Sequence, residues 1–172
     1  MKTILITGST SGIGLAAAKK LANSKNNLIL CGRRQHKLDE ISNELSKTTN
    51  VLPLCFDVSN KKEVNKVLEN LPDEFSSIDI LINNAGNAHG LDTIQDGSLD
   101  DWDNMIDSNV KGLLYVSRVI MPKMIENQNG HIINIGSLAG REVYEKGNIY
   151  CATKHAVNAI SKAMRIDLNK TG

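Results

Sequence analysis

Tyr150 and Lys154 stand four residues apart, and Ser137 lies thirteen residues before the tyrosine. Residues four apart share one face of a helix, so the lysine ammonium would lie beside the phenol. A cation about 4 Å away, at an effective dielectric of about 20, favours the phenolate by roughly 4 kcal/mol, or about three pKa units before desolvation opposes it. The spacing therefore indicates a proton donor and acceptor that works near neutral pH. Taken alone, however, such a pair is more often an ordinary helix surface.

The elements that would position these residues alternate between short apolar runs and longer amphipathic stretches. The apolar runs predict strands at 3–7, 27–31, 51–56, 78–82 and 131–135. The amphipathic stretches predict helices at 12–23, 35–46, 61–71, 99–127 and 150–169. Strands that are almost entirely apolar are buried on both faces, as in a parallel sheet. Their alternation with helices predicts a doubly wound α/β domain of the Rossmann type over residues 1–172.

A glycine-rich turn joins the first expected strand to the first expected helix. Glycine lets the backbone turn tightly and approach a pyrophosphate, and the free amides at the helix start attract the anion. The residues expected to bind a nucleotide here are Gly8, Ser9, Thr10, Ser11, Gly12, Ile13 and Gly14. Their spacing, Gly-x-x-x-Gly-x-Gly, is looser than Gly-x-Gly-x-x-Gly, and a plain strand-to-helix turn is the alternative.

Two arginines, Arg33 and Arg34, follow the second expected strand at the place where a carboxylate would select the ribose 2′-hydroxyl of NAD. Guanidinium groups suit a 2′-phosphate through forked, charge-assisted hydrogen bonds. The sequence therefore favours NADP over NAD as the cofactor. The alternative is a solvated basic start to the next helix.

Further cofactor contacts are expected after the third and fourth strands, because ligands of open α/β sheets bind beyond the carboxyl ends of the strands. Asp57 and Val58 follow the third strand, and Asn84, Ala85 and Gly86 follow the fourth. Asp57 would accept a hydrogen bond from the adenine amine, and the small residues leave room for a cofactor against the backbone. As isolated features these segments are more often a helix cap and a plain turn.

The composition narrows the classes of function. The chain has 172 residues, of which 41% are hydrophobic and 23% charged, and its formal net charge is +1. It therefore lacks the charge that attracts nucleic acid or anionic membranes, and no apolar run has the length to span a bilayer. The first residues do not resemble a signal peptide. Cys31, Cys55 and Cys151 have no metal-ligand spacing, so we expect buried free thiols, no metal site and a cytoplasmic protein.

The motifs together resemble those of the short-chain dehydrogenase/reductase family, in its single-domain branch. The matching elements are Thr7-Gly8-x-x-x-Gly12-Ile13-Gly14, Asn83-Asn84-Ala85-Gly86, Asn109, Ser137 and Tyr150-x-x-x-Lys154, in the family's order and spacing. More narrowly, the stretches 31–34, 78–86, 102–109 and 131–137 are similar to those of NADP-dependent 3-hydroxy acid dehydrogenases. Members of that group oxidise serine-like and other small 3-hydroxy acids, or reduce malonic semialdehyde.

The resemblance implies catalytic roles for four residues. Tyr150 would exchange a proton with the substrate oxygen, and Lys154 would lower the pKa of that tyrosine and bind the nicotinamide ribose. Ser137 would hydrogen-bond the substrate oxygen as charge develops. Asn109 would hold a water that links Lys154 to solvent. Tyr150 and Lys154 would thus also bind the cofactor, and Ser137 and Tyr150 the substrate, while the cofactor carries the hydride.

The resemblance also implies partners and a longer chain. In this family the region equivalent to 99–127 and the last helix form a four-helix dimer contact, so we expect a homodimer or homotetramer. Burial within one chain is the alternative. Family members continue with two more strands after the tyrosine–lysine helix. We therefore expect the sequence to be truncated at its C-terminal end, without the part that completes the sheet and shapes the substrate pocket.

Alternative functions and roles stay open. Reduction of a 3-oxoacyl group on a carrier protein uses the same four residues. A non-catalytic NADP-binding module is the alternative for the truncated chain, although the intact serine, tyrosine, lysine and asparagine set argues against it for the parent protein. Arg141 is a candidate partner for a substrate carboxylate, although a solvated loop arginine is favoured. His89 and His155 are candidate acid–base groups, although structural roles are favoured for both.

Overall fold

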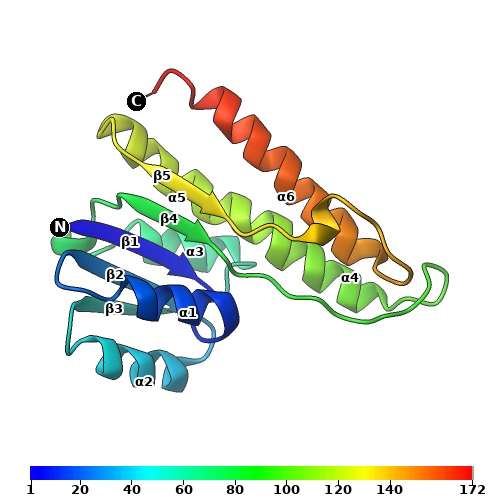
Figure 1. The fold of residues 1–172 in the computed structure, drawn as a ribbon, viewed down its shortest axis with the longest axis horizontal. Coiled ribbons are helices and arrows are strands. Elements are labelled where there is room, and N and C mark those ends of the chain that lie inside the picture. The colour runs from blue at the N-terminus through cyan, green and yellow to red at the C-terminus, as the bar shows by residue number, and fades with distance from the viewer. Residues whose placement is uncertain (172) are drawn as a thin grey trace.

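Five parallel strands form one sheet in the order β3-β2-β1-β4-β5, with helices on both faces (Figure 1). The computed structural model describes residues 1–171. The strands are β1 (Lys2–Thr7), β2 (Asn26–Gly32), β3 (Asn50–Cys55), β4 (Ile80–Asn83) and β5 (His131–Asn134). The helices are α1 (Gly12–Leu21), α2 (Gln35–Leu45), α3 (Lys61–Leu68), α4 (Leu99–Ile106), α5 (Leu113–Glu126) and α6 (Asn148–Asp167). This strand order is the Rossmann order, so the predicted doubly wound α/β fold is confirmed.

Successive residues of the central strands point into two separate cores, which is why these strands are apolar throughout. One core joins Leu5, Ile29 and Leu81 of the strands to apolar residues of α3 and α5. The other joins Ile4, Leu28 and Ile82 to apolar residues of α1 and α2. The two cores fix the sheet between the helix layers and hold its carboxyl edge in place.

The order in which strands are added to the sheet reverses at β1, because β1 pairs with β2 on one side and with β4 on the other. The loops after β1 and β4 therefore diverge at the carboxyl edge of the sheet. Such a switch point opens a crevice between neighbouring loops, and ligands of this fold class bind there. The glycine-rich turn and the 84–86 segment both lie at this edge.

The expected long helix at 99–127 is not continuous α-helix. A π-helical segment, η2 (Asp107–Gly112), separates α4 from α5. A π segment inserts an extra residue into the turn, and such segments are frequent at functional sites. Asn109, a predicted catalytic residue, lies inside η2. The spacing of apolar residues does not reveal such a widened turn. The prediction of one continuous helix was therefore wrong at this point.

Smaller differences concern helix boundaries and one thiol. Helix α6 begins at Asn148, two residues before the expected start, so Tyr150 belongs to its first turn. Helix α3 ends at Leu68 instead of 71. Cys31 and Cys151 are buried free thiols as predicted, whereas Cys55 is exposed because it ends β3 at the outer edge of the sheet. Within residues 1–171, no helix has both the length and the apolar character needed to cross a membrane.

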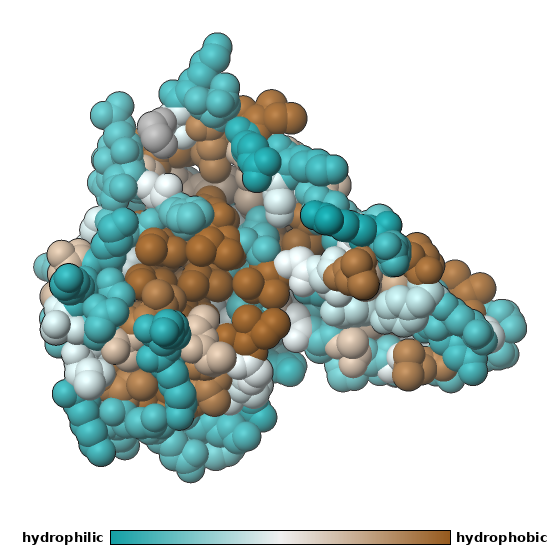
Figure 2. Space-filling model, viewed as in Figure 1, coloured by the Kyte–Doolittle hydropathy of each residue, from teal (hydrophilic) through white to brown (hydrophobic). Residues whose placement is uncertain are grey.

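One face of the sheet is only partly covered near its β5 edge. Ile80, Ile133 and Ile135 lie on the same side as α1 and remain partly buried. Figure 2 shows apolar residues gathered on this face of the molecule, over the strands between α1 and α6. Strand β5 pairs with β4 and is the last strand of the sheet among the described residues. Strand β5 therefore has one edge without a pairing strand among the described residues.

Candidate active site

The turn after β1 is held against the end of β4 by a set of short hydrogen bonds. The Thr7 hydroxyl accepts from the backbone amides of Asn84 and Ala85, each at 3.0 Å. The Asn84 side chain donates to the carbonyls of Thr7 at 2.9 Å and Gly8 at 3.1 Å. These bonds fix the two diverging loops relative to each other and define the floor of the crevice.

Two glycines are required by this close approach. Gly8 has a φ of 64°, and a Cβ atom there would lie 2.8 Å from the Cα atom of Ala85. A Cβ atom on Gly14 would lie 2.4 Å from both the Asn84 Nδ2 atom and the Gly8 carbonyl oxygen. Backbone amides therefore reach the crevice without intervening side chains. Such a cradle is what a pyrophosphate needs.

A cleft of about 580 Å³ opens above this cradle. Of the predicted cofactor-binding residues, those that line it are Gly8, Thr10, Ser11, Gly12, Ile13, Arg33, Arg34, Asp57, Val58, Asn84, Ala85, Gly86, Tyr150 and Lys154. Ser9 and Gly14 do not line it. Ser9 is fully buried and donates to the Cys31 carbonyl at 3.1 Å, and Gly14 packs behind the turn. Both residues support the cradle from behind.

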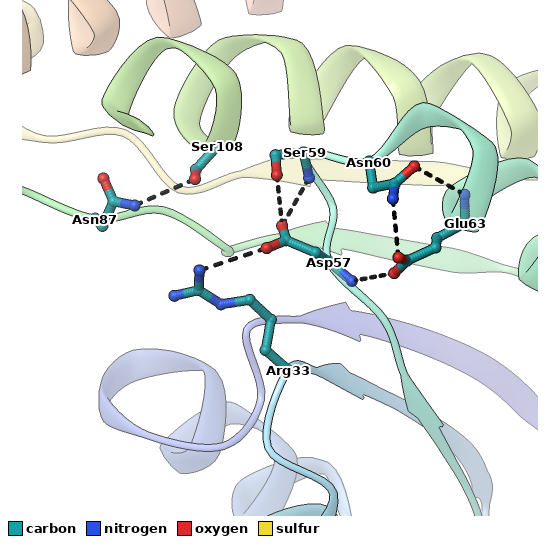
Figure 3. Close-up of polar contacts among 7 residues, drawn as sticks. All are labelled: Arg33, Asp57, Ser59, Asn60, Glu63, Asn87 and Ser108. Carbon is teal, nitrogen blue, oxygen red and sulfur yellow. Dashed lines mark hydrogen bonds and ion pairs between the residues drawn. The ribbon is translucent and has the colours of Figure 1, made fainter. Parts of the chain in front are cut away.

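Arg33 and Arg34 hold different positions at the rim of the cleft. The Arg34 guanidinium donates to the Thr10 hydroxyl at 2.8 Å and to the Ser11 hydroxyl at 3.2 Å. Arg33 instead reaches across the opening to the Asp57 carboxylate at 3.4 Å, and the two side chains point toward one another in Figure 3. Arg34 is thus held over the glycine-rich turn, where an additional phosphate on a ribose would meet its charge.

Asp57 is fixed by the residues that start α3. Its carboxylate accepts from the Ser59 amide and hydroxyl at 2.9 and 2.8 Å, and its own amide donates to Glu63 (Figure 3). Burial raises the pKa of the Asp57 carboxyl, but the Ser59 hydrogen bonds and the Arg33 charge together lower it below the usual value. Asp57 therefore carries a negative charge beside the cleft and is available as an acceptor.

Tyr150 and Lys154 line the same cleft and lie one helical turn apart on α6. The Lys154 Nζ atom lies 6.0 Å from the centre of the Tyr150 ring and donates to the Ile135 carbonyl at 2.9 Å. The lysine residue is only 8% exposed, and this burial lowers the pKa of its ammonium. The expected common helix face is present, and the backbone just after β5 anchors the cation.

The Asn109 side chain is fully occupied by bonds within the protein. Its Oδ1 atom accepts from the Asn87 amide at 2.8 Å, and its Nδ2 atom donates to the Asn87 carbonyl at 2.8 Å and to the Thr153 hydroxyl at 3.1 Å. It is buried beside Gly86, where a Cβ atom would lie 2.9 Å from Asn109 Oδ1 and 3.9 Å from Lys154 Nζ. Asn109 therefore ties the loop after β4 to α6, next to the lysine, and its expected role with water stays a prediction.

Ser137 lies beside the cleft rather than in its wall. It caps the N-terminus of the short helix η3 (Leu138–Gly140), and its hydroxyl accepts from the Ala139 amide at 3.2 Å. It is exposed in a neighbouring hollow of about 470 Å³ that also contains Lys154 and Arg141. Among the described hydrogen bonds none joins Ser137 to Tyr150. The two residues thus flank Lys154 from adjoining hollows.

Sequence reasoning missed several residues of the cleft wall. These are Gly32, Phe56, Asn87, Ser108, Ile135 and Gly136. Most are sequence neighbours of predicted residues, so the rule that ligands bind beyond strand ends would have included them. Asn87 and Ser108 needed the fold, because the π-helical segment brings the Ser108 hydroxyl within 3.2 Å of the Asn87 Nδ2 atom (Figure 3).

The residues of the cleft fit a dinucleotide cofactor. The cradle presents backbone where Cβ atoms would collide, and the rim presents two guanidinium groups. A volume of about 580 Å³ lies within the range of cofactor sites. Among residues 1–171, no three histidine, cysteine or acidic side chains are grouped to hold a metal ion.

Comparison with known proteins gives a consistent result. The family model for short chain dehydrogenases matches residues 2–172. An NADP-dependent 3-hydroxy acid dehydrogenase of Shigella flexneri is 43% identical over 168 residues, which cover 98% of this chain and 67% of that protein. An NADP-dependent 3-hydroxy acid dehydrogenase of Schizosaccharomyces pombe is 46% identical over 167 residues, covering 95% of this chain and 64% of that protein. The chain thus spans about two thirds of the length of these relatives.

Solved structures are similar over the same extent. The closed form of serine dehydrogenase complexed with NADP+ superposes with a TM-score of 0.94 at 42% identity, covering 98% of this chain and 67% of that one. NAD+-bound xylitol dehydrogenase superposes with the same TM-score at 27% identity, covering 99% of this chain and 66% of that one. The fold is therefore shared by proteins solved with either nicotinamide cofactor, and the residues of the cleft must decide between them.

Proposed function

The chain belongs to the short-chain dehydrogenase family, and on that premise we propose that it is an NADP-dependent oxidoreductase acting on the alcohol or carbonyl group of a small 3-hydroxy acid. The observation that carries this proposal is one continuous cleft. Its walls include the glycine cradle, the two arginines, Tyr150 and Lys154. A dinucleotide held by the cradle would extend toward the tyrosine.

Tyr150 is the proton-exchanging group in this proposal. During oxidation its phenolate oxygen takes the proton from the substrate hydroxyl, and during reduction its hydroxyl returns a proton to the carbonyl oxygen. The bound cofactor supplies the other half of the chemistry, since it accepts or donates the hydride. Lys154 holds a positive charge 6.0 Å from the centre of the tyrosine ring, which favours the phenolate.

Ser137 and Asn109 support this exchange in different ways. The Ser137 hydroxyl is exposed next to Lys154, where it can donate to a substrate oxygen that gains negative charge. Asn109 holds the loop after β4 against α6, so that the cleft keeps its width beside Lys154. The serine thus acts on the substrate, whereas the asparagine positions the elements around it.

The choice of NADP follows from the rim of the cleft. No carboxylate follows β2, and Arg34 is already held over the turn by Thr10 and Ser11. A ribose with a 2′-phosphate would gain a charge-assisted bond there, whereas an unphosphorylated ribose would not. The relatives named for NADP-dependent activity on 3-hydroxy acids support the same choice.

A panel of cofactors and alcohols tests this function. The purified full-length protein is incubated with NADP+ or NAD+ and with serine, 3-hydroxypropionate or a series of simple alcohols, and the nicotinamide absorbance is followed. We expect oxidation of at least one 3-hydroxy acid, with a higher kcat/KM for NADP+ than for NAD+. Absence of turnover with every alcohol, or a preference for NAD+, would reject the proposal.

A further inference from the structure

A second cavity of about 480 Å³ adjoins the cofactor cleft on the other side of Tyr150. The 88–91 segment after β4 forms one wall, and the 144–150 segment leading into α6 forms the other. These two segments meet beside α4 in Figure 1, and the Asn148 side chain donates to the Asp92 carbonyl at 2.9 Å between them. Tyr150 lines both hollows. A substrate with its hydroxyl at Tyr150 can therefore extend its other end into this second cavity.

The charged groups that line this cavity are basic. Its ionisable lining consists of His89, Lys146 and the two tyrosines Tyr144 and Tyr150, and no aspartate or glutamate among residues 1–171 lines it. Asp92 and Asp101 line a small adjoining crevice whose walls also include His89 and Lys146 but not Tyr150. Neither His89 nor Lys146 forms an ion pair with a described residue. Lys146 thus lines the cavity that it shares with Tyr150 and forms no ion pair with a described residue, while two carboxylates lie in the adjoining crevice.

The backbone of Lys146 strengthens this observation. The Gly147 amide donates to the Tyr144 carbonyl at 3.0 Å, which closes a turn, and Lys146 occupies the third position of that turn with a φ of 64°. A positive φ at this position favours glycine or asparagine, and any other side chain is strained there. Strain of this kind is concentrated at binding and catalytic sites. The turn would be more stable with glycine, so the lysine is unfavourable for folding at a position that lines the cavity.

We propose that Lys146, with His89 beside it, binds the carboxylate of the hydroxy acid whose hydroxyl meets Tyr150. The inference rests on the proposed function, because it assigns the acid end of the same substrate. Arg141 is the competing partner, since it is exposed in the hollow that contains Ser137. That hollow does not include Tyr150, whereas the cavity of Lys146 does. The cavity of Lys146 is therefore the one that connects the carboxylate to the reacting hydroxyl.

Binding to a non-reacting complex tests the inference without turnover. NADPH cannot oxidise an alcohol, so the NADPH-loaded full-length protein is titrated calorimetrically with 3-hydroxypropionate and with 1,3-propanediol, which lacks the carboxylate. We expect Lys146→Gln to weaken binding of the acid about ten-fold, which corresponds to about 1.4 kcal/mol, and to leave the diol unchanged. His89→Gln should weaken binding of the acid by a smaller factor. Lys146→Arg, which keeps a positive charge, should retain most of the affinity for the acid.

Matched variants separate this effect from folding and from bulk charge. Lys146→Gly removes the ammonium and also relieves the strain of the left-handed backbone. It should therefore weaken binding of the acid, while the melting temperature stays equal or rises. Lys47→Gln removes an exposed charge that follows α2 and should leave both ligands unaffected. In turnover assays, Lys146→Gln should raise KM for the acid, with little change in kcat.

The outcomes distinguish the subsite from the proposed reaction. The inference is overturned if Lys146→Gln leaves the affinity for the acid unchanged, if it weakens acid and diol equally, or if Arg141→Gln carries the loss instead. It is also overturned if the wild type binds the acid no more tightly than the diol. Acid binding that depends on Lys146, without hydride transfer from any hydroxy acid to NADP+, supports the subsite and rejects the proposed function.

Discussion

Lys154 is the residue that joins the two halves of the site. Its ammonium donates a hydrogen bond to the Ile135 carbonyl and lies beside the Tyr150 ring. Gly86 lies next to both this ammonium and the Asn109 side chain. A single cation can thus favour the tyrosine phenolate and meet a cofactor in the cleft. Its burial makes both effects stronger, because water screens the charge less.

The buried charge of Lys154 predicts a dependence of stability on pH. The pKa of this ammonium is lowered by burial, whereas an unfolded lysine keeps a pKa of about 10.4. Below the lowered pKa, Lys154 is protonated in both the folded and the unfolded protein. The whole cost of burying its charge then lowers the free energy of unfolding. As pH rises from the folded pKa toward about 10.4, the unfolded state binds more protons, so the free energy of unfolding rises.

Urea unfolding of the wild type and of Lys154→Met across this alkaline window measures the effect. We expect the difference in unfolding free energy to shift in favour of the wild type as pH rises, because the variant lacks the titrating group. Subtraction of the variant removes the contributions of the other titrating residues. A difference that stays constant with pH would contradict a lowered pKa for Lys154.

Arg34 predicts the cofactor preference. Arg34→Leu removes the guanidinium held over Thr10 and Ser11, and we expect about a thirty-fold loss of NADP affinity, or about 2 kcal/mol for a charge-assisted bond. NAD affinity should change little, as measured by calorimetry. Lys25→Gln, at the opposite end of β2, is the control and should affect neither cofactor. Equal losses for NADP and NAD would show that Arg34 merely supports the turn.

At the scale of secondary structure, the shape of the glycine cradle depends on the close contact between the start of α1 and the end of β4. Helix propensity alone predicts that alanine at Gly14 stabilises α1 by about 1 kcal/mol. The structure predicts the opposite, because the new Cβ atom would lie 2.4 Å from Asn84 Nδ2 and from the Gly8 carbonyl oxygen. We expect Gly14→Ala to lower the unfolding free energy by about 2 kcal/mol, as overpacking does, and to weaken NADP binding.

Gly136→Ala is the matched control for this prediction. No atom lies within 4 Å of a Cβ built on Gly136, so the unfolding free energy should change by no more than about 0.5 kcal/mol. Denaturant unfolding of both variants makes the comparison. A Gly14→Ala protein as stable as the wild type would contradict the described contact between the turn and Asn84.

The order of elements could be predicted from the sequence, because apolar runs and amphipathic stretches reflect burial directly. The residues that line the cleft followed from the rule that ligands bind beyond strand ends, which placed Arg34, Asp57 and Gly86 there. The π-helical turn could not be predicted, because its widened hydrogen bonds leave no mark in apolar spacing. Motif spacing does not separate residues of the cradle surface from those behind it, such as Ser9 and Gly14, whose expected contact with the cofactor stays a prediction.

At the scale of the whole molecule, three apolar side chains on α4 and α5, here called the stripe, are exposed. Leu99 is 69% exposed, and Leu114 and Ile125 are each 40% exposed. Leu114 and Ile125 lie on one side of α5, since eleven residues make about three helical turns. We propose that this stripe forms the contact between two copies of the chain, because exposed apolar surface of this kind marks interaction sites.

A charge placed in the stripe tests this contact. Leu114→Glu should convert the assembly to monomers, as measured by sedimentation velocity, because the carboxylate would be buried without a partner. Ser46→Glu adds the same charge after α2, away from the stripe, and should leave the assembly intact. An unchanged mass for Leu114→Glu would show that the stripe is not the contact.

The most direct test of the proposed reaction is the rate of Tyr150→Phe. None of the described hydrogen bonds involves the Tyr150 hydroxyl, so its loss should leave the fold and the affinity for NADP unchanged. Oxidation of a 3-hydroxy acid by NADP+ should fall by at least about a hundred-fold, which is the usual contribution of a proton-exchanging side chain. A variant that binds NADP and keeps the wild-type rate would contradict the assignment of Tyr150 as the group that takes the substrate proton.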